Sequence, residues 1–248
     1  MDRTAIRMSG AADAGHDEVH WLTRVGGAGA IAGAVLAGVG NLLHPVTPRD
    51  DAAGVARVIA TNDAWTLIHL VIIAGTLLMF AGLVGLRAAL PQAGFAGAMT
   101  RLGVHAAVIG TVLGVVTVIL DGVGAKQLAD EWAAASADQQ AVALGIVSAN
   151  ETTNFALAGM FNATFAGIPF VLFGLAIARA TGFPRWLGWV ATLAGLGSIA
   201  AGIVQALTGR PTVASLVLTI IGPTVIALWM LAIGVLMLRR TRRPAADI

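Results

Sequence analysis

Long apolar runs alternate with short polar segments along the chain. Six stretches contain no Asp, Glu, Lys or Arg, and each is long enough to cross a bilayer as a helix, which takes about 20 residues. These stretches are 25–43, 64–86, 102–120, 152–178, 186–209 and 211–238. A transmembrane β-barrel would require segments of alternating polarity, whereas these runs are continuously apolar. The pattern therefore predicts an all-α polytopic membrane protein, a bundle of six transmembrane helices.

The distribution of basic residues predicts how this bundle is oriented. Eleven arginines fall in segments that would face the cytoplasm if the N-terminus is inside, against four basic residues in the outer segments. Such an excess marks cytoplasmic flanks. The resulting organisation is a cytoplasmic N-terminal tail over 1–24, a single transmembrane domain over 25–238 and a basic cytoplasmic tail over 239–248. The outer segments are 44–63, 121–151 and position 210.

Small residues form a face on the first span and another on the third. Such faces allow close helix packing inside the chain, or contact with a protein partner or a second copy, although glycine and alanine are also abundant throughout this sequence. The residues are Gly26, Ala30, Gly33, Ala37 and Gly40, continued by His44, and Gly103, Gly110, Gly114 and Thr117, continued by Asp121.

The outer segments contain signals for further helices. Thr47 and Pro48 predict the start of a short helix that lies along the membrane interface, and Trp65 is interpreted as an interfacial anchor. Ser136 begins a sequence that resembles a capping box, which predicts a turn between two helices. The third span would then continue beyond the membrane and form an outer helical hairpin with the fourth.

Composition restricts the chemistry that the chain can perform. Hydrophobic residues make up 57% of the sequence, which a soluble domain could not cover with a polar surface. Cysteine is absent, so disulfides, thiolate nucleophiles and Cys-ligated metals are excluded. A bis-histidine haem is not expected either, because His69 and His105 fall at opposite membrane faces. The net charge of +2 is spread over span ends, which argues against nucleic-acid binding and leaves the lipid bilayer as the expected environment.

The candidate site lies at the outer ends of the spans. If the small faces of the first and third spans pack inward, His44 and Asp121 converge, and Glu151 lies at the same depth with His69 as a fourth member. Imidazole and carboxylate ligands could bind a divalent cation. They could equally form a proton-linked switch or an interfacial ion pair without catalytic importance. Their spacing matches no local metal-binding motif.

A polar stripe continues from this site into the fourth span. Asn154 and Asn162 fall on the face that begins at Glu151, and Pro169 follows on the same arc. Polar side chains at this depth face protein or a cavity. Hydrogen bonds between helices and a ligand cavity are both compatible with the stripe. Pro169 and Pro223 predict kinks in the fourth and sixth spans.

Several short segments resemble uncharacterised six-helix membrane proteins of high-GC bacteria, a family defined as a domain of unknown function. The resemblance implies a multi-pass protein of the bacterial cytoplasmic membrane, and it carries no activity and no functional residues. The segments are Asn41 to Pro45, Trp65 with His69, Leu120-Asp121-Gly122 with Lys126, and Pro184 to Gly188.

Three functional hypotheses follow from the sequence. The first is a non-enzymatic membrane component that binds a small ligand or a protein partner. The second is a small transporter in which the kinks at Pro169 and Pro223 surround a midplane cavity. The third is a metal-dependent membrane enzyme centred on His44, Asp121 and Glu151. Other cofactors are not assigned.

Overall fold

The computed structural model describes residues 3–48, 51–209 and 212–242, and the regular elements within these ranges are helices. Position 210, the first residue of the last predicted span and residues 243–248 of the predicted tail lie outside the described residues. The α-helices are α1 (Arg3–Leu43), α2 (Ala52–Ala60), α3 (Trp65–Ala89), α4 (Gly94–Val118), α5 (Ala125–Ala134), α6 (Gln140–Phe161), α7 (Ile168–Arg179), α8 (Arg185–Thr208) and α9 (Val213–Thr241). Two π-helical turns, η1 (Ile119–Gly124) and η2 (Asn162–Gly167), connect α4 to α5 and α6 to α7.

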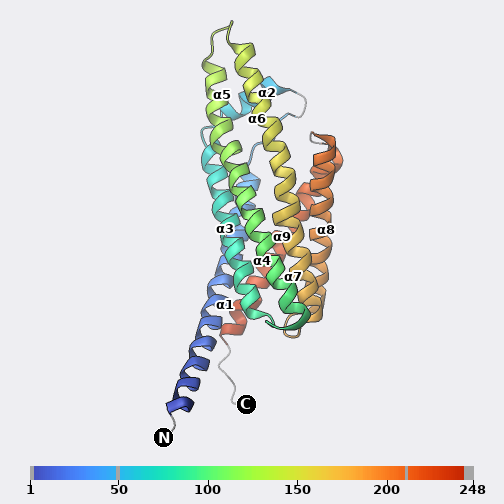
Figure 1. The fold of residues 1–248 in the computed structure, drawn as a ribbon. Helices are drawn as coiled ribbons and strands as arrows, with labels where there is room; N and C mark the ends of the chain where they lie inside the picture. The colour runs from blue at the N-terminus through green and yellow to red at the C-terminus, as the bar shows by residue number, and fades with distance from the viewer. Residues whose placement is uncertain (1–2, 49–50, 210–211, 243–248) are drawn as a thin grey trace.

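Six of the described helical stretches are long and apolar enough to cross a membrane: α1, α3, α4 through α5, α6 through α7, α8 and α9. This confirms the prediction of an all-α bundle with six membrane-spanning helices. The start of α1 and the end of α9 lie at one end of the bundle, which we call the terminal end (Figure 1). The opposite end carries α2 and the α5–α6 turn, and we call it the loop end. Residues 3–24, predicted as a tail, are the first part of α1.

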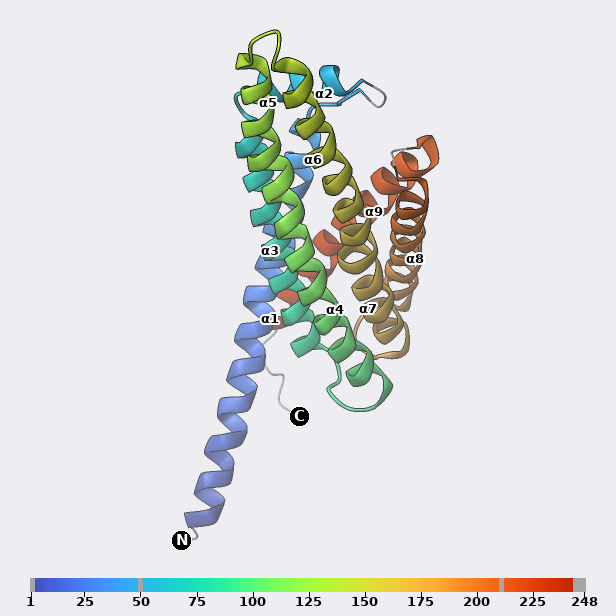
Figure 2. The same cartoon turned by 45° about the horizontal axis from the view of Figure 1, so that its top comes forward.

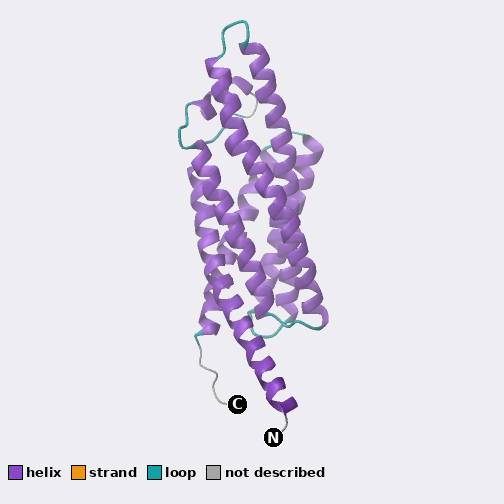
Figure 3. Ribbon diagram, turned by 60° about the vertical axis from the view of Figure 1, so that its left-hand side comes forward, coloured by secondary structure: helices purple, strands orange, loops and turns teal. Residues whose placement is uncertain are grey.

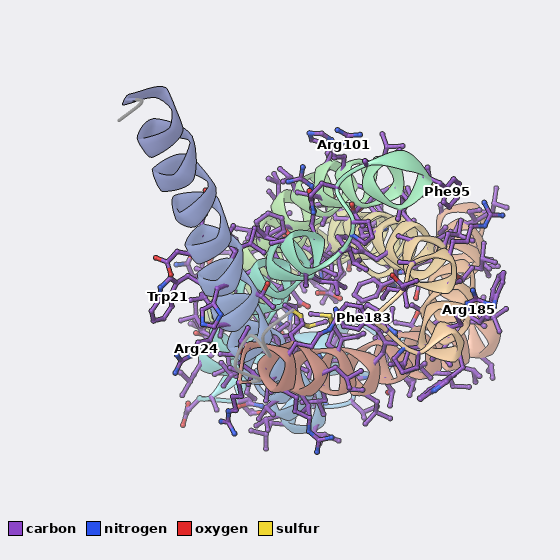
Figure 4. All side chains as sticks on the ribbon, turned by 90° about the horizontal axis from the view of Figure 1, so that it is seen from below. Trp21, Arg24, Phe95, Arg101, Phe183 and Arg185 are labelled. Carbon is purple, nitrogen blue, oxygen red and sulfur yellow. The ribbon has the colours of Figure 1, made fainter. Side chains whose placement is uncertain are left out.

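The spans follow one another around the bundle in chain order. Each packs against the next, and α9 returns to pack against α1 (Figure 2). The view from the terminal end shows the same closed arrangement (Figure 4). Short connections between consecutive spans favour antiparallel neighbours, which accounts for this order. The bundle is therefore an up-and-down ring in which the first span, α1, and the last span, α9, are neighbours.

Large side chains fill the centre of the bundle. Phe170 and Phe173 of α7, Leu83 of α3 and Trp229 of α9 are each no more than 2% exposed, and the Trp229 indole donates a hydrogen bond to the Leu187 carbonyl. The outer faces of the helices are apolar as well. Side chains there that are more than half exposed include Leu67, Ile109, Leu193 and Ile220. Because apolar side chains point both inward and outward, the outer surface is suited to lipid.

Close backbone contact joins α1 to α3. A Cβ atom at Gly33 would lie 2.5 Å from the Met79 amide nitrogen and 2.7 Å from the Gly75 carbonyl oxygen. The small face of α1 thus packs against α3, whereas that of α4 packs against the fourth span, with Gly110 against the Phe165 backbone. The two small faces do not meet each other, because α3 lies between α1 and α4.

At the loop end, α5 and the first half of α6 rise above the bundle as a helical hairpin, and α2 packs against it (Figure 3). This confirms the predicted helical hairpin. The predicted start of α2 at Thr47 is wrong: the helix begins at Ala52, because Asp51 provides the cap by accepting a hydrogen bond from the Gly54 amide. The interpretation of Trp65 as an interfacial anchor is also wrong, since Trp65 is only 1% exposed beneath α2 and α5.

Candidate metal centre

Three elements bring the ionisable side chains of the loop end together. His44 follows the last residue of α1, His69 lies one turn into α3, and Asp121 is the third residue of η1. One nitrogen from each imidazole and one carboxylate oxygen of Asp121 all lie within 4.8 Å of one another. Two histidines and one carboxylate from three separate segments of the chain therefore form a group compact enough to share one metal ion.

The aromatic rings fix the orientation of both histidines. The centroids of the His44, His69 and Trp65 rings lie 4.9 Å apart in each of the three pairs. His69 is 2% exposed, whereas the Asp121 side chain is 24% exposed. The group is thus packed from the side of Trp65 and open to solvent on the side of Asp121.

Backbone carbonyls determine which imidazole nitrogens are available. His69 Nδ1 lies 2.7 Å from the Trp65 carbonyl oxygen, and His44 Nδ1 lies 2.9 Å from that of Pro45. A carbonyl can only accept, so in the neutral rings Nδ1 carries the proton and Nε2 keeps a lone pair. Metal-binding histidines are commonly held in this way, with the remote N–H donated to a backbone carbonyl.

The Nε2 atom of His69 has no hydrogen-bond partner among the described residues, although it is buried. Asp121 Oδ2 lies 3.2 Å from it, at ion-pair distance for a protonated imidazole. A buried polar atom without a partner is costly and calls for an explanation. A cation bound between the nitrogen and the carboxylate would satisfy both groups.

Two hydrogen bonds attach η1 to the start of α3. The Trp65 indole donates to the Asp121 carbonyl at 2.8 Å, and the Thr66 hydroxyl donates to the Gly122 carbonyl at 2.7 Å. Gly122 is required for this approach, because a Cβ atom there would lie 2.4 Å from the Cβ of His69. Single-turn π-helices often occur at functional sites. Here the π-helical turn positions Asp121 beside His69.

Glu151 of α6 adds a second carboxylate nearby. It interacts electrostatically with Asp121, and its Oε1 atom is buried without a hydrogen-bond partner. Within the part of the chain that the structure describes, no Lys or Arg lies at ion-pair distance from either carboxylate. A bound cation would neutralise these two neighbouring carboxylates, which no described Lys or Arg does.

Burial favours the neutral, metal-binding form of His44. Removal from water lowers the pKa of His44 below its usual value of 6.5, and the charge of the neighbouring His69 lowers it further. Asp121 and the Pro45 carbonyl act in the opposite direction without reversing the shift. A metal ligand must be unprotonated, so His44 is available at neutral pH.

The four residues proposed from the sequence do not contribute equally to this group. His44, His69 and Asp121 lie together, while Glu151 lies beside Asp121 and outside the group of three. Trp65, which contacts both imidazoles, was missed as part of the site. Trp65 lies one turn before His69 on the same helix, and this spacing could have indicated that the two side chains are neighbours.

The polar stripe on the fourth span makes contacts between helices. Asn162 donates to the Gln205 side-chain oxygen of α8 at 3.4 Å, and Gln205 donates to the Phe155 carbonyl at 3.0 Å. Asn154 is buried with its side-chain oxygen unpaired among the described residues. Gln205 was not included in the predicted stripe, although it is a polar residue within a charge-free span.

Comparison with known families adds one finding. The family defined as a domain of unknown function, DUF4386, matches residues 25–234. The chain belongs to this family. Comparisons with curated proteins and with solved structures gave no match. The DUF4386 match includes all or most of each of the six spans and the three residues of the candidate metal centre, and it assigns no activity to them.

Proposed function

We propose that this DUF4386 protein is a non-enzymatic component of the bacterial cytoplasmic membrane that binds a divalent metal ion on its outer face. His44, His69 and Asp121 would be the ligands. The observation that supports this most directly is the pair of backbone carbonyls that accept from both Nδ1 atoms, in a group whose imidazole nitrogens and Asp121 oxygen lie within 4.8 Å of one another. The outer location and the cytoplasmic position of both termini rest on the arginine distribution.

The ligand types favour a borderline metal such as Zn²⁺. Zinc is commonly bound by imidazole nitrogen and carboxylate oxygen at about 2.0–2.2 Å. Fe²⁺ and Mn²⁺ also accept two histidines and one carboxylate, whereas Ca²⁺ and Mg²⁺ prefer oxygen ligands alone. Three protein ligands would leave one tetrahedral position for water or for an external ligand.

A metal titration tests the proposal. The purified protein is expected to bind one Zn²⁺ per chain, and His44→Ala is expected to weaken binding at least tenfold because one of three ligands is lost. Isothermal titration calorimetry gives the affinity, and Co²⁺ absorption reports nitrogen and oxygen ligation. His105→Ala is the matched control, since His105 is an exposed histidine of α4 near the terminal end.

Two results would refute a metal site here. One is the absence of stoichiometric binding by the wild-type protein for Zn²⁺, Fe²⁺ and Mn²⁺ alike. The other is an equal loss of affinity in His44→Ala and His105→Ala, which would indicate non-specific binding to surface histidines.

A second candidate function is metal-dependent catalysis, and the unpaired Glu151 oxygen favours it. A carboxylate close to a metal-bound water could accept its proton, as a general base does. Glu151→Gln is expected to retain Zn²⁺ affinity within about threefold, because Glu151 lies outside the group of three ligands. An enzyme would then lose turnover in this variant while keeping its metal. A large loss of affinity would instead identify Glu151 as a ligand.

The other hypotheses gain less support. A transporter with a midplane cavity is not favoured, because Phe170, Phe173 and Trp229 fill the bundle centre. Two apolar grooves, about 300 and 370 Å³ in volume, lie between α8 and α9 and between α1 and the start of α3. The small face of α1 offers little surface to a partner, since α3 covers it.

A further inference from the structure

Three polar side chains on one face of α6 end in buried atoms that have no hydrogen-bond partner among the described residues. These atoms are Asn150 Nδ2, Glu151 Oε1 and Asn154 Oδ1. Asn154 lies four residues after Asn150 and three after Glu151, so the three side chains share one face of the helix. Buried polar atoms are normally paired, and three unpaired ones so close together indicate that something other than the chain binds them.

The first part of this face packs against η1. The Asn150 side-chain oxygen lies 3.9 Å from the position that a Cβ atom of Gly124, the last residue of η1, would take. Glu151 interacts electrostatically with Asp121, the third residue of the same turn. The unpaired atoms of Asn150 and Glu151 therefore lie on the side of α6 that meets Asp121.

Asn154 belongs to the same interface. Seven residues after it, on the same face, the Phe161 ring lies 2.5 Å from the position of a Cβ atom at Gly114 of α4. Because α4 and α6 are antiparallel, the residues opposite Asn154 lie about two turns beyond Gly114, at the level of Asp121. Asn154 is only 8% exposed. Its unpaired oxygen is thus enclosed at the depth of the two carboxylates.

The ligand types on this face differ from those of the two histidines. Asp121 and Glu151 offer carboxylate oxygens and Asn154 an amide oxygen. The oxygen and nitrogen of an amide have the same shape, so a turned Asn150 side chain would add a fourth oxygen. Ca²⁺ binds carboxylate and amide oxygens in a flexible geometry completed by water, whereas Mg²⁺ is usually held by one or two carboxylates and several waters.

We infer that Asp121, Glu151 and Asn154 bind a Ca²⁺ ion beside the metal centre. Asp121 Oδ2 lies next to His69 Nε2, which leaves Oδ1 for this second ion, so Asp121 would bridge the two sites. The Ca²⁺ neutralises both carboxylates and gives the buried Asn154 oxygen a partner. The inference adds a cation that the proposed Zn²⁺ function does not include, and it does not require Zn²⁺ to be bound.

Terbium luminescence of the detergent-purified, metal-free protein tests this inference. Tb³⁺ replaces Ca²⁺ on oxygen ligands, and it can be excited through Trp65, whose indole donates a hydrogen bond to the Asp121 carbonyl. Wild type is expected to show saturable Tb³⁺ luminescence. Ca²⁺ should displace the Tb³⁺ with a dissociation constant of about 0.1–1 mM, the range of extracellular Ca²⁺ sites, and Mg²⁺ should displace it much less.

Variants of α6 identify the ligands. Glu151→Gln is expected to weaken Ca²⁺ binding roughly tenfold or more, because the number of charged ligands sets the affinity. Asn154→Leu should weaken it as well without leaving a buried polar atom unpaired, and Asn154→Asp should restore it. Glu131→Gln is the matched control, since Glu131 is an exposed carboxylate of α5 at the loop end.

The histidine variant separates the two sites. His44→Ala should leave Ca²⁺ binding unchanged, because no imidazole takes part in it, and a loss of Ca²⁺ binding there would overturn the inference. So would Tb³⁺ luminescence that Ca²⁺ does not displace at about 10 mM, displacement by Mg²⁺ as strong as by Ca²⁺, or equal effects of Glu151→Gln and Glu131→Gln. A protein that binds Ca²⁺ but no Zn²⁺ would support this inference and refute the proposed function alone.

Discussion

Asp121→Asn is expected to reduce the Zn²⁺ affinity of the loop end by roughly hundredfold or more, equivalent to about 2.8 kcal/mol. Asp121 is the one carboxylate in the group of three ligands, so its replacement removes the anionic ligand and leaves two neutral imidazoles. Asparagine keeps the size of the side chain. The backbone carbonyl of residue 121, which accepts the Trp65 indole hydrogen bond, is also retained. The expected loss is therefore one of charge and coordination and not of folding. Calorimetric titration with Zn²⁺ measures it.

The matched control for this variant is Asp130→Asn. Asp130 lies on α5 at the same end of the bundle, is exposed and pairs with Lys126. The same chemical change there should leave Zn²⁺ affinity within about twofold, because exposed ion pairs contribute little. A similar loss in both variants would mean that general negative charge attracts the metal. Unchanged affinity in Asp121→Asn would remove Asp121 from the ligand set.

The membrane fold was predictable because its main determinant is local. A helix that crosses lipid must be continuously apolar, and runs such as 64–86 and 186–209 show this directly. Packing partners were harder to predict. The small face that includes Gly33 was recognised, but a helical wheel gives a direction around one helix and not the neighbour that occupies it. That neighbour is α3, and the small face of α4 meets the fourth span instead.

The members of the candidate site were predictable from the sequence, but their arrangement was not, because a helical wheel does not show which helix lies opposite. The sequence predicts His44, Asp121 and Glu151 as the main members of the site and His69 only as a fourth. His44 lies beyond the end of α1, so the wheel of α1 does not determine where it points. Asp121 lies in a π-helical turn, where the bonding pattern differs from the α-helix that the wheel assumes. These two departures bring both residues to His69.

The burial of Trp65 could not be inferred from hydrophobicity. A tryptophan at the start of a span is usually an interfacial anchor. Here α2 packs against α5 above it, so Val55, Ile59 and Ala129 cover the ring. That arrangement depends on contacts between residues far apart in the sequence. The indole then becomes a support for the site, through its contacts with His44 and His69.

Gly33→Ala is expected to destabilise the bundle by about 1–3 kcal/mol, the usual range for overpacking a closely packed interior. The added methyl group would lie 2.5 Å from the Met79 nitrogen and 2.7 Å from the Gly75 oxygen. Both are backbone atoms of α3, so no side-chain rotation can relieve the contact. The thermal unfolding midpoint in detergent should fall by roughly 2–10 °C.

Gly38→Ala separates this packing effect from the general effect of alanine in a helix. Gly38 lies on the same helix, and a Cβ atom there would have no neighbour within 4 Å. Its midpoint should be unchanged or slightly higher, because alanine favours helix more than glycine does. Gly33→Ala should also weaken Zn²⁺ binding, since moving α1 away from α3 separates His44 from His69. Equal midpoints for the two variants would contradict the close α1–α3 contact. A lowered midpoint with unchanged Zn²⁺ affinity would instead show that the metal centre does not depend on this contact.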